Sequence, residues 1–182
     1  MNAVIEADLY RYGGLTGWKG FLKGILIPGF RYTYLLRKAA MHSKYSLAGV
    51  FFRLMLRRYS FKYGFQVAVQ ATIGKGFYIG HFGAIVISPY ARLGSNCNVA
   101  QGVTIGQTNR GRSKGTPVIG DFVWIGANAV VVGGIRIGNN VLIAPNAYVN
   151  FDVSDNAIVV GNPGKIIERE DPTAEYIEHV LP

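Results

Sequence analysis

Residues 119–149 read IGDFVWIGANAVVVGGIRIGNNVLIAPNAYV, and an aliphatic residue returns at every sixth position of this stretch. The recurring residues are Ile119, Ile125, Val131, Ile137, Ile143 and Val149. An α-helix cannot keep this spacing on one face, because about 3.6 residues per turn carries the stripe around the axis. Short strands joined by sharp turns can keep it, and glycine or alanine usually follows each aliphatic position. The stretch therefore predicts a β-helix built from six-residue repeats.

The same spacing continues upstream, where it is interrupted twice. The upstream repeats begin at Val67, Ile73, Ile79, Ile87, Leu93, Val99 and Ile105. The step from Ile79 to Ile87 is eight residues, so two residues are inserted there, and His81 lies in the insertion. A polar, basic stretch at 107–116 replaces regular repeats and predicts an exposed loop. Because three repeats make one triangular coil, we expect about four to five coils, with function at the interruptions.

The composition indicates one folded domain in a reducing compartment. The chain has 182 residues, of which 49% are hydrophobic, so it can bury a core and is not disordered. Its single cysteine, Cys97, excludes an internal disulfide. Cys97 is the fourth residue after Leu93 in its repeat, which predicts a core side chain rather than a reactive thiol.

The net charge of +9 belongs to the N-terminal segment. Residues 1–64 hold eleven Lys and Arg against Glu6 and Asp8, whereas the other 118 residues hold eight of each sign. The segment lacks the repeat and predicts two or three helices that cap the first coil, with breaks at 13–14 and 28–29. We therefore divide the chain into a basic helical cap (1–64), a β-helix domain (65–168) and a C-terminal tail (169–182).

Residues 47–63 predict a helix with an apolar stripe. The stripe consists of Leu47, Val50, Phe51, Leu54, Met55 and Tyr59, with most arginines outside it. One interpretation is a cap that packs on the β-helix or on a neighbouring subunit. The other is peripheral contact with an anionic membrane or a lipid-linked glycan, since each basic residue near such a surface contributes about 1 kcal/mol.

No membrane span or secretory signal is recognisable, because charged residues interrupt every apolar run. We expect a cytoplasmic protein, at the inner face of the membrane if the cap binds lipid. No nucleic-acid-binding motif accompanies the positive charge, so nucleic acid is not expected as a partner.

Three motifs together resemble those of the left-handed β-helix acyltransferases. They are the stretch 80–87 with His81, the segment 102–106 with the loop that follows, and the terminal motif 161–167. Within that superfamily the order of segments is most similar to serine acetyltransferases and to O-acetyltransferases of bacterial polysaccharide synthesis. The resemblance implies a left-handed parallel β-helix, acetyl-CoA as cosubstrate, and a homotrimer with active sites between subunits.

An alcohol needs a base to remove its proton as it attacks a thioester, and histidine suits that task near neutral pH. His81 is the one histidine within the repeats and matches the catalytic histidine of the family. We expect a backbone carbonyl to orient its ring. His42 and His179 lie outside the coils, and we interpret them as surface or packing residues. The repeat region therefore lacks a histidine cluster, and no metal is expected.

The resemblance also implies a set of binding residues. The cofactor-binding candidates are Gly106, Trp124, Gly126, Ala127, Ala144 and Lys165. Small residues at coil corners permit close approach of the pantetheine chain, although tight turns alone also explain them. Lys165 is placed for the phosphates of coenzyme A. Arg110 and Arg112 are candidates for binding phosphates or an anionic substrate, and an exposed loop tip is the alternative.

Three positions depart from the serine acetyltransferase pattern. Gly80 and Gln66 stand where that family carries aspartates, and Thr116 stands where it carries a histidine after an arginine. Gln66 is our remaining acceptor-binding candidate at these positions. Because partners for an ammonium and a carboxylate are missing, we expect a carbohydrate hydroxyl as acceptor, in capsular or exopolysaccharide synthesis.

Other functions stay open from the sequence. The alternative is serine O-acetylation in cysteine synthesis. N-acetylation of an amino sugar would use the same base, and a non-catalytic trimeric scaffold would need no His81.

Overall fold

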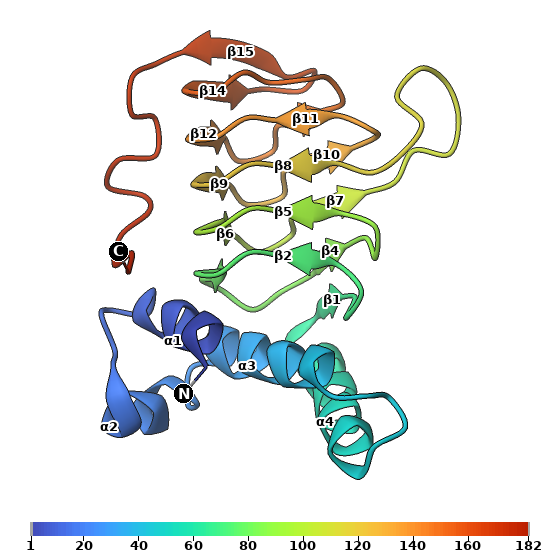
Figure 1. Ribbon diagram of the computed structural model, residues 1–182. Coiled ribbons are helices and arrows are strands. Elements are labelled where there is room, and N and C mark those ends of the chain that lie inside the picture. The colour runs from blue at the N-terminus through green and yellow to red at the C-terminus, as the bar shows by residue number, and fades with distance from the viewer. Residues whose placement is uncertain (1, 182) are drawn as a thin grey trace.

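The computed structural model describes residues 2–181, in which a parallel β-helix stands on a cap of four helices (Figure 1). The cap comprises α1 (Ala3–Tyr10), α2 (Gly17–Gly24), α3 (Pro28–Met41) and α4 (Leu47–Tyr63). Pro28 opens α3, because its missing N–H costs nothing at the first helical position. Gly64 ends α4 in a left-handed conformation with φ of 74°.

The strands form three sheets, one on each side of a triangular stack. Sheet A contains β1 (Phe65–Val67), β4 (Ile85–Ile87), β7 (Thr104–Gly106), β10 (Val130–Val132) and β13 (Tyr148–Val149). Sheet B contains β2 (Thr72–Ile73), β5 (Arg92–Leu93), β8 (Val118–Ile119) and β11 (Arg136–Ile137). Sheet C contains β3 (Tyr78–Ile79), β6 (Asn98–Val99), β9 (Val123–Ile125), β12 (Val141–Ile143), β14 (Ala157–Val160) and β15 (Lys165–Glu168). β15 pairs antiparallel with β14 and closes the stack.

The aliphatic positions of the repeat stack on one another in register, so the predicted left-handed β-helix with a helical cap is confirmed. In sheet A the stack is Val67, Ile87, Ile105, Val131 and Val149. In sheet B it is Ile73, Leu93, Ile119 and Ile137, and in sheet C it is Ile79, Val99, Ile125, Ile143 and Val159. Cys97 is fully buried among them, and burial raises the pKa of its thiol to about 12, as a core side chain requires.

The cap provides hydrogen-bond partners for the backbone groups at the open edge of the first coil, on all three sides of the triangle. The Tyr32 hydroxyl meets β1, since it donates to the Phe65 carbonyl at 3.3 Å and accepts from the Val67 N–H at 3.3 Å. The Tyr12 hydroxyl does the same for β3, at 3.2 Å from both the carbonyl and the N–H of Ile79. An uncovered strand edge would leave these backbone groups without partners.

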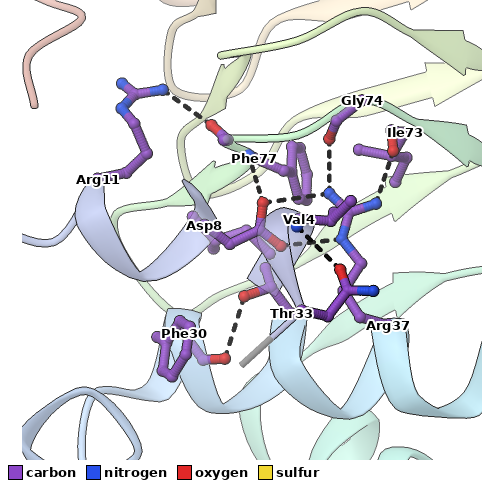
Figure 2. Close-up of polar contacts among 12 residues, drawn as sticks. Val4, Asp8, Arg11, Phe30, Thr33, Arg37, Ile73, Gly74 and Phe77 are labelled. Atoms are coloured by element: carbon purple, nitrogen blue, oxygen red, sulfur yellow. Dashed lines mark hydrogen bonds and ion pairs between the residues drawn. The ribbon is translucent and has the colours of Figure 1, made fainter. Parts of the chain in front are cut away.

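On the third side, a buried ion pair closes the edge at β2 (Figure 2). Arg37 Nε lies 2.9 Å from Asp8 Oδ2, and its other nitrogens donate to the carbonyls of Ile73 and Gly74 at 2.6 Å each. Asp8 also accepts from the Phe77 N–H at 2.9 Å. Burial raises the pKa of Asp8, and the Arg37 guanidinium opposes that rise. The pair therefore joins α1 and α3 to the first coil.

Helix α4 has the predicted bounds, and its predicted apolar stripe packs on this chain only through Met55 and Tyr59. Leu47, Val50, Phe51 and Leu54 are exposed, whereas Gly49, Leu56 and Tyr63 form the buried line. Both faces of α4 are thus apolar, and the sequence left open whether the predicted stripe packs on this chain, on a neighbouring subunit or on a membrane. Gly49 lies so close to the Ser43 carbonyl that a Cβ would collide with it, so glycine is needed where the α3–α4 connection enters the helix.

Residues 169–181 run back along the outer face of sheet C towards α1 (Figure 1). The Asn98 amide donates to the Tyr176 carbonyl at 3.0 Å, and Arg11 Nε donates to the Glu178 carbonyl at 2.8 Å. Arg11 also donates to the Gly76 carbonyl and to Asn98 Oδ1, so it links the tail to the cap and the first two coils. Within residues 2–181, no helix combines the length and hydropathy that a membrane crossing needs.

We expect Asp8→Asn to destabilise the fold by about 3–5 kcal/mol, because it leaves the Arg37 guanidinium buried without its carboxylate. Urea denaturation monitored by circular dichroism measures this free energy of unfolding. Glu6→Gln on the same helix is the matched control, and its effect should stay within about 0.5 kcal/mol. Equal effects of the two variants would contradict the assigned role of the pair.

Candidate functional site

His81 lies in the turn between β3 and β4, where sheet C turns into sheet A. We call the line of such turns up the stack the C–A edge. The His81 side chain is exposed, and its turn is fixed to the end of α4 by two backbone hydrogen bonds. The Gly83 N–H donates to the Tyr63 carbonyl at 2.8 Å, and the Ile85 N–H donates to the Gly64 carbonyl at 3.0 Å. The insertion therefore presents His81 outward on a fixed backbone.

The surroundings of His81 differ from those expected for a carboxylate-supported base. The backbone-carbonyl partner expected for the His81 imidazole stays a prediction. At Gly80, an added Cβ would lie 3.1 Å from Tyr78 Cε1 and 3.7 Å from the Tyr78 hydroxyl oxygen. The Tyr78 side chain thus occupies space that an aspartate at position 80 would need.

Small residues continue along the C–A edge above His81. Ala127 and Ala144 follow β9 and β12 there, and the Asn146 N–H donates to the Ala127 carbonyl at 2.8 Å. Lys165 lies at the top of this edge, because it pairs with Val160 at the end of β14. With strands about 4.8 Å apart, the row from His81 to Lys165 spans roughly 24 Å. Its members are partly or fully exposed, so a long, thin ligand has access to backbone groups.

Gly126 is required by packing between coils. An added Cβ at Gly126 would lie 2.6 Å from the Pro145 nitrogen and 2.8 Å from Trp124 Cζ3. Trp124 itself lies on the outer face of sheet C, with its ring 4.9 Å from that of Tyr176 in the tail. Its neighbour is therefore this chain's own tail, a contact that the repeat pattern did not reveal.

The structure places three other candidates at a different edge, where sheet A turns into sheet B. Gly106 ends β7 there, and the basic loop follows it. Reciprocal backbone hydrogen bonds of 2.9 Å between Thr108 and Gly115 close the base of the loop. Arg110 and Arg112 are exposed beyond this closure. Within one chain, then, these arginines and His81 are on different edges of the triangle.

A cavity of about 700 Å³ lies between α4 and the outer face of sheet A, beside the His81 turn. Gln66 on β1 lines it, as do Ser60 and Arg57 from α4 and Ala84 from the His81 turn. Arg57 is the one charged side chain among the lining residues, and its guanidinium carbon lies 5.9 Å from the centre of the Phe61 ring. Sequence reasoning missed Arg57, because nothing local distinguishes it from the adjacent Arg58.

The remaining histidines take part in packing, as predicted. His42 stacks on Phe52 with ring centres 5.5 Å apart, and His179 meets Tyr10 edge-on at 6.3 Å. Among the residues that the structure describes, no three His, Cys, Asp or Glu side chains are grouped so that they could hold a metal ion.

The comparisons with known proteins agree with this architecture. The family described as bacterial transferase hexapeptide (six repeats) matches residues 116–150. A serine acetyltransferase of Synechococcus elongatus is 36% identical over 116 residues, which cover 64% of this chain and 48% of that protein. The chain spans only about half to three fifths of the length of such curated relatives.

Two solved structures extend the likeness to the helical cap. The Neisseria gonorrhoeae serine acetyltransferase in complex with serine is 32% identical, with a TM-score of 0.73 over 89% of this chain and 67% of that one. The Brucella abortus serine acetyltransferase in complex with coenzyme A is 27% identical, with a TM-score of 0.76 over 91% of this chain and 67% of that one.

These relatives correct the expected acceptor. We predicted a carbohydrate hydroxyl and a role in polysaccharide synthesis, and this prediction was wrong, because the curated relatives at 36–39% identity are serine acetyltransferases. The prediction rested on residues missing at positions 66, 80 and 116. It did not consider that a folded cavity can draw polar groups from elsewhere, and here Arg57 and Ser60 of α4 face it. By repeat, fold and sequence, the chain belongs to the left-handed β-helix acetyltransferases and resembles serine acetyltransferases.

Proposed function

We propose that this protein transfers the acetyl group of acetyl-CoA to the hydroxyl of serine. One observation carries the proposal: exposed His81 lies at the foot of a row of small residues and beside a cavity that contains an amide and a cation. The serine and coenzyme A complexes of the two solved relatives support these ligand classes.

In this reaction His81 acts as the general base. A ring nitrogen accepts the proton of the serine hydroxyl while the oxygen attacks the thioester carbonyl. The tetrahedral intermediate then expels the thiolate of coenzyme A, which takes the proton from the imidazolium. The products are O-acetylserine and coenzyme A, and His81 returns to its neutral form.

The C–A edge is the site that we propose for the pantetheine chain. That chain is rich in amides and needs exposed backbone donors and acceptors along a narrow path. Ala127 and Ala144 leave such a path open because their side chains are short. Lys165 is exposed at the far end of the row, and its ammonium group can bind phosphate as a point charge.

The cavity beside His81 is our proposed acceptor site. Arg57 would pair with the serine carboxylate, which a guanidinium binds in a bidentate manner. Gln66 would accept a hydrogen bond from the serine ammonium through its amide oxygen. This contact is weaker than one to a carboxylate, so we expect modest affinity for serine.

We further propose a cytoplasmic homotrimer with active sites between subunits. The basic loop and His81 lie on different edges of one triangular stack. Arg110 and Arg112 can therefore approach His81 only from a neighbouring subunit. In that arrangement they would add positive charge near the phosphates of the donor.

Replacement of His81 by alanine should lower kcat by about 10²–10⁴-fold, because a positioned general base contributes about this factor. Release of free thiol from acetyl-CoA in the presence of serine measures this change. His42→Ala, a histidine outside the coils, is the matched control and should retain full activity. Absence of serine-dependent thiol release by the wild-type protein, while another hydroxylated acceptor supports it, would overturn the proposal.

The variant Arg57→Gln should raise the KM for serine by about tenfold or more, because the carboxylate loses a charged partner. The KM for acetyl-CoA should change little. Arg58→Gln, the next residue on α4, controls for the loss of one charge from the helix. If both variants raise the serine KM equally, Arg57 has no specific place in the acceptor site.

Substitution of Ala144 by phenylalanine should raise the KM for acetyl-CoA by about tenfold or more without raising that for serine, because the ring would block the donor path. Ala40→Phe, at an exposed position of α3, is the control for added apolar surface. An unchanged KM for acetyl-CoA in a folded Ala144→Phe protein would show that the donor does not bind along the C–A edge.

A further inference from the structure

The outward face of α4 carries exposed apolar residues from its first turn to its last. Leu47, Leu54 and Phe61 are 93%, 60% and 78% exposed, and Val50 and Phe51 extend the same surface. These five residues define what we call the α4 outer face. The opposite side of the helix already packs through Gly49, Leu56 and Tyr63, so this surface is a second apolar side and not a misplaced core. Exposed apolar patches of this kind mark interaction sites.

Cations alternate with these apolar residues. Arg58 and Lys62 project from the same side of α4, because they are four and eight residues beyond Leu54. Residues 9–120 contain sixteen Lys and Arg and no Asp or Glu. The acidic residues before that range are Glu6 and Asp8 on α1, and Asp8 is buried against Arg37. No carboxylate in the range 9–120, which includes all of α4, is present to neutralise these cations.

Helix α2 carries a similar, shorter surface. Trp18 and Leu22 on α2, and Leu26 in the turn that follows it, recur at four-residue intervals and are 71%, 49% and 72% exposed. Lys19 and Lys23 stand beside them and are also exposed. In Figure 1, α2 and α4 both lie at the end of the molecule opposite β15. The cap therefore displays two apolar and basic helices at one end.

This combination of groups fits an anionic lipid surface. A helix that lies in the membrane interface places its Leu, Phe and Trp side chains at the acyl boundary, while Arg and Lys meet the phosphates. Contact between two copies through the same face would instead bring cations against cations without an intervening carboxylate. The charge thus favours a negatively charged partner, and the exposed leucines and phenylalanines favour a lipid one.

We propose that the cap docks the protein on anionic membranes through the α4 outer face together with Lys44, Arg58 and Lys62. Helix α4 lies flat on the surface and does not cross it. This docking is independent of the acceptor that the enzyme uses.

Sedimentation of the full-length protein with vesicles tests this proposal. The protein should bind phosphatidylcholine vesicles that contain phosphatidylglycerol and should not bind vesicles of phosphatidylcholine alone. Raising the ionic strength from about 0.1 M to about 1 M should weaken binding, because the Debye length falls from about 10 Å to about 3 Å.

Two variants separate the contributions of charge and apolar contact. The triple variant Lys44→Gln, Arg58→Gln, Lys62→Gln should bind anionic vesicles about 100-fold more weakly. The triple variant Leu47→Ser, Phe51→Ser, Leu54→Ser should weaken binding at low and high salt alike, since buried apolar area is not screened. Circular dichroism and thiol release with free serine verify that both variants are folded.

The control variant Lys75→Gln, Arg92→Gln, Arg136→Gln removes the same charge from exposed positions on the β-helix. It should bind vesicles as the wild type does. An equal loss of vesicle binding in this control would show that net charge alone explains the effect, and it would contradict the proposed docking surface. Failure of the wild type to bind anionic vesicles would also overturn it. So would sedimentation velocity in which the Leu47→Ser, Phe51→Ser, Leu54→Ser variant forms a smaller species than the wild type, because the α4 outer face would then join copies of the chain.

Discussion

The structure depends on the in-register stacking of aliphatic residues from coil to coil. Each inward residue of the repeat lies directly above its counterpart, so three continuous columns fill a narrow interior. A shift of one residue in any strand would turn its apolar side chain outward and bring a polar one in. The corners of the triangle therefore align as well. This alignment brings His81, Ala127 and Ala144, which are far apart in sequence, onto one edge.

The same constraint explains why an interruption of the repeat becomes a site. The eight-residue step leaves the columns intact, since Ile79 still pairs with Val99 and Ile87 with Ile105. The interior has no space for the two extra residues, and they are forced outward with the His81 turn. The rigid stack thus holds His81 in solvent without disturbing the packing of the core. The basic loop at 107–116 is extruded in the same way at another edge.

Much of this architecture is predictable from local pattern, and the exceptions have physical causes. The repeat identifies the strands, and the range 47–63 matches α4. The inward face of α4 is not predictable from its period, because both faces are apolar. Arg57 and the tail contacts of Arg11 were missed because they join segments far apart in sequence. Asp8 and Arg37, 29 residues apart, likewise give no local signal of their pairing.

The acceptor was mispredicted because the prediction used only the residues missing at positions 66, 80 and 116. It took no account of the other polar groups that line the cavity.

The cap covers the open end of the stack, and its outer side is left for the second role that we propose. A first coil without a cover would leave the backbone groups of β1, β2 and β3 unpaired, and a polar helical cap is a direct solution. Tyr32, Arg37 and Tyr12 provide the covering hydrogen bonds from one side of the helices. Only part of each helix is used for this purpose, so the outer side of α4 remains exposed. The Tyr63 carbonyl at the end of that helix binds the turn that carries His81. The surface that we propose for lipid docking and the turn that carries His81, our proposed catalytic base, are therefore connected through a single helix, and anchoring α4 would set the height of the proposed active site above the membrane.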